Sequence, residues 1–344
     1  MKHRLFLIIA TAACLGSFTA CSQDNDTVVP DGDLKAAISF NVNIGQTPEP
    51  QVSMRGASTD ATATGGYVFS DGDKVCIAIT GDGTTSARST TEEKKLYKVE
   101  TANTSTGSAQ ALAYDGAATD AFIWMSKNEE IALRAWSDGT SSTTTTDPNG
   151  ETFTISTTQN SDTDIKELLY SPSPATNYSY AANSSSLNIP LYHQLARVVV
   201  NVTGTIASDV SVTSVTIGSS DKEVPTSAMF TKPSSGNYGK WSYQGTDGII
   251  TAKKEADNVF SAVVIPYDGE TNSDNYNYYH KDDEFIVITT SRGVYAYSLA
   301  SNLNIESGKQ YTFNITNLNE IKLNVTVTAW ETDTTNSKTI NFSE

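Results

Sequence analysis

Few residues of this 344-residue chain have the types and spacing that catalysis or metal binding requires. His3 lies in the N-terminal leader, so only His193 and His280 are candidates for acid–base or ligand chemistry. The sequence contains no His-Glu-x-x-His zinc motif, no Gly-x-Ser-x-Gly nucleophile turn and no phosphate-binding loop. His193 stands beside an apolar strand and is interpreted as a structural residue. We therefore predict no enzyme activity, no metal site and no cofactor.

The acidic clusters favour turns over ligand sites. Asp71-Gly72-Asp73 and Asp82-Gly83 lack the full ligand pattern of a calcium loop, and their composition is typical of turns. Residues 276–284 combine tyrosines, His280 and carboxylates, a composition that can contact a glycan. A solvated hairpin tip is the favoured interpretation of this segment.

The charge balance excludes one class of partner. The chain has a formal net charge of −16, and removal of the basic leader makes it more negative. Such a surface repels nucleic acid and anionic membrane surfaces. We predict no nucleic-acid partner, and we interpret the charge mainly as a source of solubility.

Residues 1–20 have the order of a secretory signal peptide. Lys2 and Arg4 precede an apolar run over residues 5–16, and the small residue Ala20 stands immediately before Cys21. This ending resembles a lipobox, which implies a diacylglycerol on Cys21 and anchoring in the outer membrane. An ordinary signal peptide with an accidental cysteine is the alternative. Residues 21–33 would then form an acidic polar tether.

Cysteine usage also excludes a disulfide framework. Cys14 leaves with the leader and Cys21 is the predicted lipidation site, so Cys76 is the one cysteine that remains. It lies inside the apolar run 75–79 and is interpreted as a small core residue. No second long apolar run follows the leader, so no transmembrane helix is predicted.

Alternation with a period of two predicts strands throughout the rest of the chain. Residues 34–44 form the clearest example, and the loop 45–66 that follows contains two prolines and a single basic residue, Arg55. Residues 164–170 fit one helical turn or a strand. Further strands are predicted over residues 69–80, 96–99, 122–125, 131–136, 152–155, 210–217, 249–251, 259–266, 284–290, 294–299, 310–316 and 321–330.

Residues 187–202 mark the seam between two predicted domains. Apolar residues alternate through both halves of this stretch, a Ser/Asn/Pro/Tyr-rich loop precedes it, and new strands follow it. The sequence therefore predicts an all-β protein with two tandem antiparallel β-sandwich domains, over residues 34–186 and 187–344.

Three segments resemble the fimbrillin family, the pilins and pilus-associated lipoproteins of certain Gram-negative anaerobes. They are Gly72-Asp73-Lys74-Val75, then Leu168-Leu169-Tyr170 followed by His193-Gln194-Leu195-Ala196-Arg197-Val198, and lastly Gly308-Lys309-Gln310-Tyr311. The resemblance implies transthyretin-like domains and a structural or accessory role in an adhesive fimbrium at the cell surface.

The resemblance also implies assembly by strand exchange with other pilus subunits. An arginine-specific protease would remove the first strand, and we predict that it cuts between Arg55 and Gly56, with Arg88 as the rival site. A C-terminal strand of another subunit would then fill the groove by β-strand addition. Residues 321–330 are one donor candidate, although they also fit the last strand of their own domain, and residues 339–342 are a lesser candidate.

A monomeric surface lipoprotein that binds a glycan or a host protein is the alternative hypothesis. In that case the first strand would stay in place, and residues 276–284, Trp124 or Trp136 would contact the ligand.

Overall fold

The computed structural model describes residues 35–44, 69–84, 88–100, 109–173, 175–183, 185–202, 210–243, 245–266, 279–315, 324–329 and 338–340. Nearly all of the regular structure in these ranges is β-strand, which confirms the predicted all-β class. The helical segments described there are single turns: η1 (Ala118–Asp120), η2 (Asp162–Asp164) and α1 (Tyr180–Asn183).

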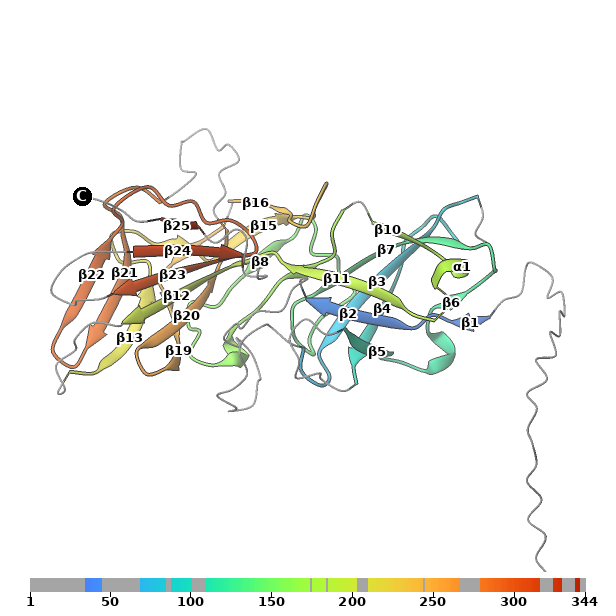
Figure 1. The fold of residues 1–344 in the computed structure, drawn as a ribbon, viewed down its shortest axis with the longest axis horizontal. Helices are drawn as coiled ribbons and strands as arrows, with labels where there is room; N and C mark the ends of the chain where they lie inside the picture. Colours follow the sequence, from blue (N-terminus) through green and yellow to red (C-terminus); the bar gives the residue numbers. More distant parts are fainter. Residues whose placement is uncertain are drawn as a thin grey trace, which may run out of the picture.

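An eight-stranded sheet forms the half of the molecule that contains the first strands (Figure 1). Its order is β10 (Thr176–Ser179), β7 (Glu130–Ser137), β3 (Lys74–Gly81), β4 (Glu93–Val99), β5 (Gln110–Tyr114), β2 (Phe40–Ile44), β11 (Leu187–His193) and β9 (Leu169–Tyr170). Beside it, β1 (Ala36–Ala37) pairs with β6 (Ile123–Trp124).

This sheet closes on itself through its shortest strand. In β9, Tyr170 pairs with Tyr192 of β11 on one side and with Trp136 of β7 on the other. A sandwich of two separate sheets was predicted for this half. The strands instead form one continuous sheet, because β9 joins both of its edges. The strand β10 extends from β7 outside this ring.

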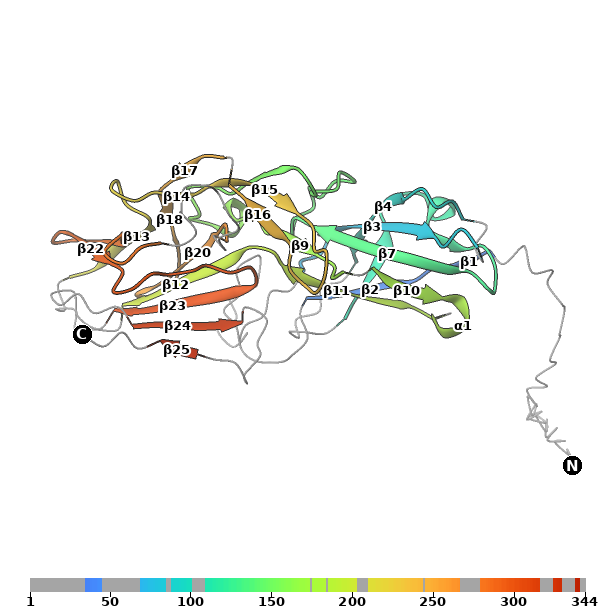
Figure 2. The same ribbon diagram turned by 90° about the horizontal axis from the view of Figure 1, so that it is seen from above.

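A six-stranded sheet and a four-stranded sheet, together with smaller ladders, form the other half (Figures 1 and 2). The first runs β19 (Lys253–Ala256), β20 (Val259–Val264), β12 (Ala196–Val202), β23 (Lys309–Ile315), β24 (Asn324–Ala329) and β25 (Lys338–Ile340). The second runs β18 (Ile250–Thr251), β13 (Val212–Ile217), β21 (Glu284–Thr290) and β22 (Val294–Ser298). Smaller ladders join β14 (Val224–Pro225) to β17 (Asp247–Gly248), and β15 (Ser227–Thr231) to both β16 (Lys240–Ser242) and β8 (Thr152–Thr154).

Among the strands that the structure describes, most pairs are antiparallel, as predicted, but two are parallel. They are β2 with β11 and β12 with β23. Both parallel pairs join segments that are far apart in the sequence, so no local turn could have indicated them.

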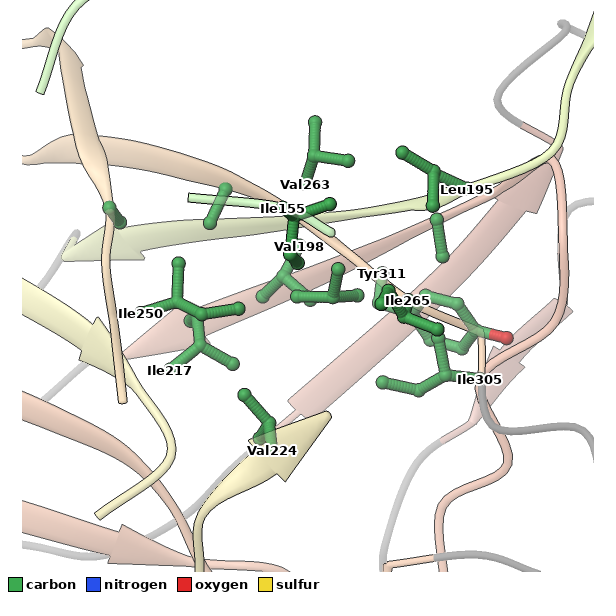
Figure 3. Packing of buried hydrophobic residues seen from close by; sticks show 14 of the residues in the cluster. Ile155, Leu195, Val198, Ile217, Val224, Ile250, Val263, Ile265, Ile305 and Tyr311 are labelled. Carbon is green, nitrogen blue, oxygen red and sulfur yellow. The ribbon is translucent and has the colours of Figure 1, made fainter. Parts of the chain in front are cut away.

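Buried side chains form two apolar clusters, one in each half, and β3 contributes to both. Val75, Ile77 and Ile79 belong to the cluster inside the closed sheet, whereas Cys76 and Ala78 belong to the other. Successive side chains of a strand point to opposite faces, so β3 is buried on both faces. This explains its uninterrupted apolar run. Val198, Ile217 and Ile250 belong to the second cluster (Figure 3).

The strand pairing departs from the predicted boundary at residues 186/187. The strand β11 stays with the first sheet because Leu187, Ile189 and Leu191 fill the first core. The chain changes sheets between β11 and β12, across Gln194 and Leu195.

A second departure involves residues 152–165. Here β8 pairs with β15 of the other half, and Ile155 and Ile165 pack in the second core. The division into two domains stays a prediction, but its strands do not follow two contiguous stretches of sequence.

Candidate assembly site around the first strand

The strand β2 is an interior strand of the closed sheet, although it is the first long strand of the chain. Its residues 40–42 pair antiparallel with residues 110–112 of β5. On its other side, residues 40–44 pair in parallel with residues 187–191 of β11, which lies beside it in Figure 1. Because β2 has a neighbour on each side, its removal would leave an unpaired edge on β5 and another on β11.

The inward face of this segment is fully packed. Ile38, Phe40 and Val42 are 4%, 1% and 0% exposed. The Phe40 ring stands edge-on to Tyr97 at 4.9 Å between centroids and lies 6.3 Å from Phe122. Burial of side chains of this size stabilises a fold by roughly 1.5–3 kcal/mol each. Loss of β2 would therefore open an apolar groove that is unfavourable in water.

The Tyr97 ring, which packs against Phe40, is held in place by a hydrogen bond of its hydroxyl. The backbone N–H of Phe122 donates to Tyr97 Oη at 2.9 Å. Burial raises the pKa of the Tyr97 hydroxyl above its ordinary value. The Tyr97 ring against Phe40 is thus anchored to the backbone of Phe122.

Asn41, on the outward face of β2, makes polar contacts with the segment that contains β11. Asn41 Nδ2 donates to Asn188 Oδ1 of β11 at 3.0 Å and to Ser186 Oγ at 3.3 Å. Asn41 and Asn188 are directly paired in the parallel register. The same pairing recurs in the other parallel pair, where Asn201 Nδ2 donates to Asn314 Oδ1 at 3.0 Å.

Lipidation is predicted at a residue before this strand, and proteolytic cleavage is predicted in the loop after it. Cys21, Arg55 and Gly56 lie outside the described residues. Their roles in lipidation and cleavage stay predictions.

Arg88, the rival cleavage site, is buried and only 5% exposed. Its Nε donates to Glu129 Oε1 at 3.0 Å, and its guanidinium lies 5.6 Å from the centre of the Phe122 ring. Glu129 is fully buried and also accepts from the N–H of Met125 at 2.6 Å. A protease requires exposed chain, so the choice of Arg88 as a rival site is wrong for the folded protein.

Side-chain hydrogen bonds hold the segment between the two halves in place. His193 Nδ1 lies 3.1 Å from Glu167 Oε2, and both side chains are buried, which confirms the structural interpretation of His193. The side chain of Gln194 donates to the Asn237 carbonyl at 3.0 Å and accepts from the Gly239 N–H at 2.7 Å. These contacts tie the turn between β11 and β12 to the second half.

A buried cation follows this turn. Arg197 Nη2 is 3.7 Å from Glu255 Oε1, and Arg197 Nη1 donates to Gln310 Oε1 at 3.2 Å. Burial lowers the pKa of Arg197 to about 10, although the charge of Glu255 opposes this effect. His193 and Arg197 are thus both buried side chains with acidic partners at the seam.

The residues proposed for glycan contact divide into buried rings and an exposed turn at Lys281 and Asp282. The rings of Trp124, Trp136 and Tyr279 are all buried. Tyr279 packs against Phe285 at 4.8 Å, and residues 276–278 lie outside the described ranges. The two indoles are therefore core residues, and their choice as ligand contacts was wrong.

In the described part of the chain, no three His, Cys, Asp or Glu side chains gather where they could hold a metal ion. Among the same residues, no helix has the length and apolar character needed to cross a membrane.

Comparison with known proteins decides the family. A sequence model of the fimbrillin-like family matches residues 59–330. The chain belongs to the fimbrillin-like family. This confirms the resemblance carried by the three sequence segments. A search of curated proteins finds no match.

Two solved structures share the fold of this fimbrillin-like chain. A proposed cell adhesion protein from Bacteroides ovatus is 15% identical, with a TM-score of 0.53 over 90% of this chain and 99% of its own. Another from Bacteroides uniformis is 12% identical, with a TM-score of 0.53 over 86% and 98%. The tip fimbrial protein Mfa3 from Porphyromonas gingivalis, with a C-terminal truncation, aligns at 10% identity and a TM-score of 0.42, over 85% and 100%. At these identities the first two alignments show a shared fold.

Sequence analysis missed two features of this fimbrillin-like site. The buried Arg88–Glu129 pair has no local signal, because the two residues are distant in sequence. The Asn41–Asn188 contact did have a local sequence signal, since each asparagine stands between two large apolar residues of a strand.

Proposed function

We propose that this protein is a structural subunit or accessory protein of an adhesive cell-surface pilus, assembled by strand exchange after proteolytic loss of β2. Family membership supports the pilus-related role. The observation that carries the proposal is the position of β2, the first long strand, which fills the interior of a sheet. A single cut after Arg55 would sever β2 from the remaining chain, so that only non-covalent contacts would hold it.

The groove left by β2 would suit a strand from another subunit. Such a strand can pair with both β5 and β11 and can also bury apolar side chains against Tyr97 and Phe122. In the uncut chain β2 occupies this place, and the protein stays monomeric. Proteolysis would therefore control when assembly begins.

The N-terminus of protein recovered from the cell surface tests this proposal. We expect it to begin at Gly56 when an arginine-specific protease is present, and expect an Arg55→Ala variant to keep the longer N-terminus. Surface protein that still begins at Cys21 in the presence of the protease would overturn the processing step and favour the monomeric surface lipoprotein.

Export as a lipoprotein forms part of the same proposal. The order of basic, apolar and small residues before Cys21 supports a lipid anchor in the outer membrane. Metabolic labelling with a fatty-acid analogue should mark the wild-type protein and leave a Cys21→Ala variant unlabelled. Equal labelling of both would refute lipidation at this residue.

A further inference from the structure

We propose that the outer edge of β22 is a contact surface for a second copy of this chain, with the two β22 strands paired antiparallel about Ala296. This contact involves neither β2 nor the predicted cleavage site, so it goes beyond the proposed strand exchange. It assigns a partner to a sheet edge that the proposed function leaves open.

The outer edge of β22 has no partner strand among the described residues. The four-stranded sheet ends at β22, which lies at the far end of the second half in Figure 1. The Thr290 N–H donates to the Gly293 carbonyl at 2.8 Å, and antiparallel pairing alternates from there along β21 and β22. The backbone N–H and C=O groups of Val294, Ala296 and Ser298 therefore point away from β21.

The strand β22 lacks the features that protect other sheet edges from pairing, such as charges, bulges and short length. The edge strand β19 carries Lys253, Lys254 and Glu255, and its pairing has a bulge at Glu255. By contrast, β22 reads Val-Tyr-Ala-Tyr-Ser, has no charged residue and is the longest edge strand in the described part of the chain. The extra residue in its pairing with β21 lies on β21, so β22 itself stays regular.

The two faces of β22 both suit a sheet that continues into a second copy. Tyr297 is buried and Tyr295 packs against the second core, so these two side chains share the inner face. On the outer face Val294 is 66% exposed, more than any other large apolar side chain among the described residues. In the proposed pair Tyr295 of one copy lies opposite Tyr297 of the other, and Val294 lies opposite Ser298. Such a cross-strand tyrosine pair favours the contact.

Charge favours a second copy as the occupant of this edge. Arg292 is exposed at the tip of the β21–β22 hairpin, and the acidic residues 282–284 stand at its other end, where the Asp282 N–H donates to the Leu299 carbonyl at 2.8 Å. Antiparallel pairing about Ala296 places Arg292 of each copy opposite Ala300 of the other, one strand away from that acidic run. The two-fold symmetry forms this opposite-charge contact twice.

The contact is small and therefore weak. Each copy contributes a strand of five residues, whereas stable interfaces involve about 20–30 residues a side. Dilute uncut chains therefore stay monomeric, and pairs form in concentrated protein. Where many copies are arrayed side by side, as in the proposed fimbrium, repeated weak contacts would add up to lateral association. Only this last step rests on the proposed function.

Cysteine substitutions test the pairing in the uncut mature chain. All chains carry Cys21→Ser and Arg55→Ala, together with Ala296→Cys or, as the matched control, Val294→Cys. In the proposed pair the two residues at position 296 face each other at about 5.5 Å between Cα atoms, which a disulfide can span. The two residues at position 294 are about 13 Å apart along the strand. Although position 294 is more exposed, we expect Ala296→Cys to form the linked dimer at least about tenfold faster in concentrated protein under mild oxidation.

A mixture of Val294→Cys chains and Ser298→Cys chains provides the second measurement. Antiparallel pairing about Ala296 places positions 294 and 298 directly opposite each other. The mixed 294–298 link should therefore form in preference to both self-links. Parallel pairing would instead favour the self-links.

Each outcome supports or overturns the pairing. Faster linking of Ala296→Cys together with the mixed 294–298 link would support it. Linking of Val294→Cys at an equal or higher rate, or absence of the mixed link, would overturn the proposed direction and register. No link in any variant that circular dichroism shows to be folded would overturn pairing between copies and leave the edge to a strand of a different protein. None of these results bears on strand exchange at β2, because every chain remains uncut.

Discussion

Buried charges are the residue-scale feature with the largest expected effect on folding. Arg88 and Glu129 neutralise each other inside the first half, and both are also hydrogen-bonded to the backbone. Removing one partner of such a pair leaves an uncompensated charge in a medium that solvates it poorly.

We predict that Arg88→Met lowers the free energy of unfolding by about 3–5 kcal/mol, because the Glu129 carboxylate loses its counter-ion. Urea denaturation of the mature chain measures this change. Lys254→Met is the matched control, since Lys254 pairs with the exposed Asp257 and its loss should have no measurable effect. A double Arg88→Met, Glu129→Gln variant should recover part of the loss, and a purely additive result would contradict this account.

Cys76 gives a prediction for pH dependence. Burial raises the pKa of its thiol from 9.0 to about 12. The folded state therefore favours the protonated thiol, so its contribution to stability is complete below about pH 9 and is lost as the pH rises through about 12. The free energy of unfolding should fall less steeply over this range in Cys76→Ala than in the wild-type protein. Identical slopes would contradict burial as the cause.

At the scale of elements, alternation in the sequence predicted most of the strands that form the core. It did not predict β5, which pairs with β2 in the candidate site. The strands β2, β3 and β11 follow clear apolar patterns. The strand β5 was missed because Ala111 and Ala113 give little hydrophobic contrast. The closure of the sheet through β9 was also missed, because a strand of only two residues is defined by its distant partners.

The site itself could be predicted only in part. The removable first strand and its apolar face were evident from residues 34–44. Its neighbours were not, because parallel pairing with β11 depends on the tertiary fold and not on a local turn.

We predict that the inward face of β2 contributes strongly to the stability of the uncut chain. Phe40→Ala should lower the free energy of unfolding by about 3–5 kcal/mol, because it opens a cavity beside Tyr97. The neighbouring Ser39 is exposed, and Ser39→Ala should change it by no more than about 0.5 kcal/mol. Urea denaturation measures both. Similar values for the two variants would show that β2 is not firmly packed.

At the scale of the whole molecule, the two halves lie end to end and share structure (Figures 1 and 2). Cys76, Ala78 and Trp136 come from strands of the closed sheet, yet they pack into the second core. We therefore predict that the uncut mature chain unfolds in a single calorimetric transition, with equal calorimetric and van't Hoff enthalpies. Two resolved transitions would show that the halves are independent.

In the proposed assembly, a strand from another subunit enters the place of β2. The most direct test is the mass of the purified mature chain in solution, measured by light scattering before and after treatment with an arginine-specific protease. We predict a monomer before cleavage, a series of multimers after cleavage and loss of β2, and a persistent monomer for Arg55→Ala under the same treatment. Wild-type protein that is cut after Arg55, releases β2 and still remains monomeric would contradict the account.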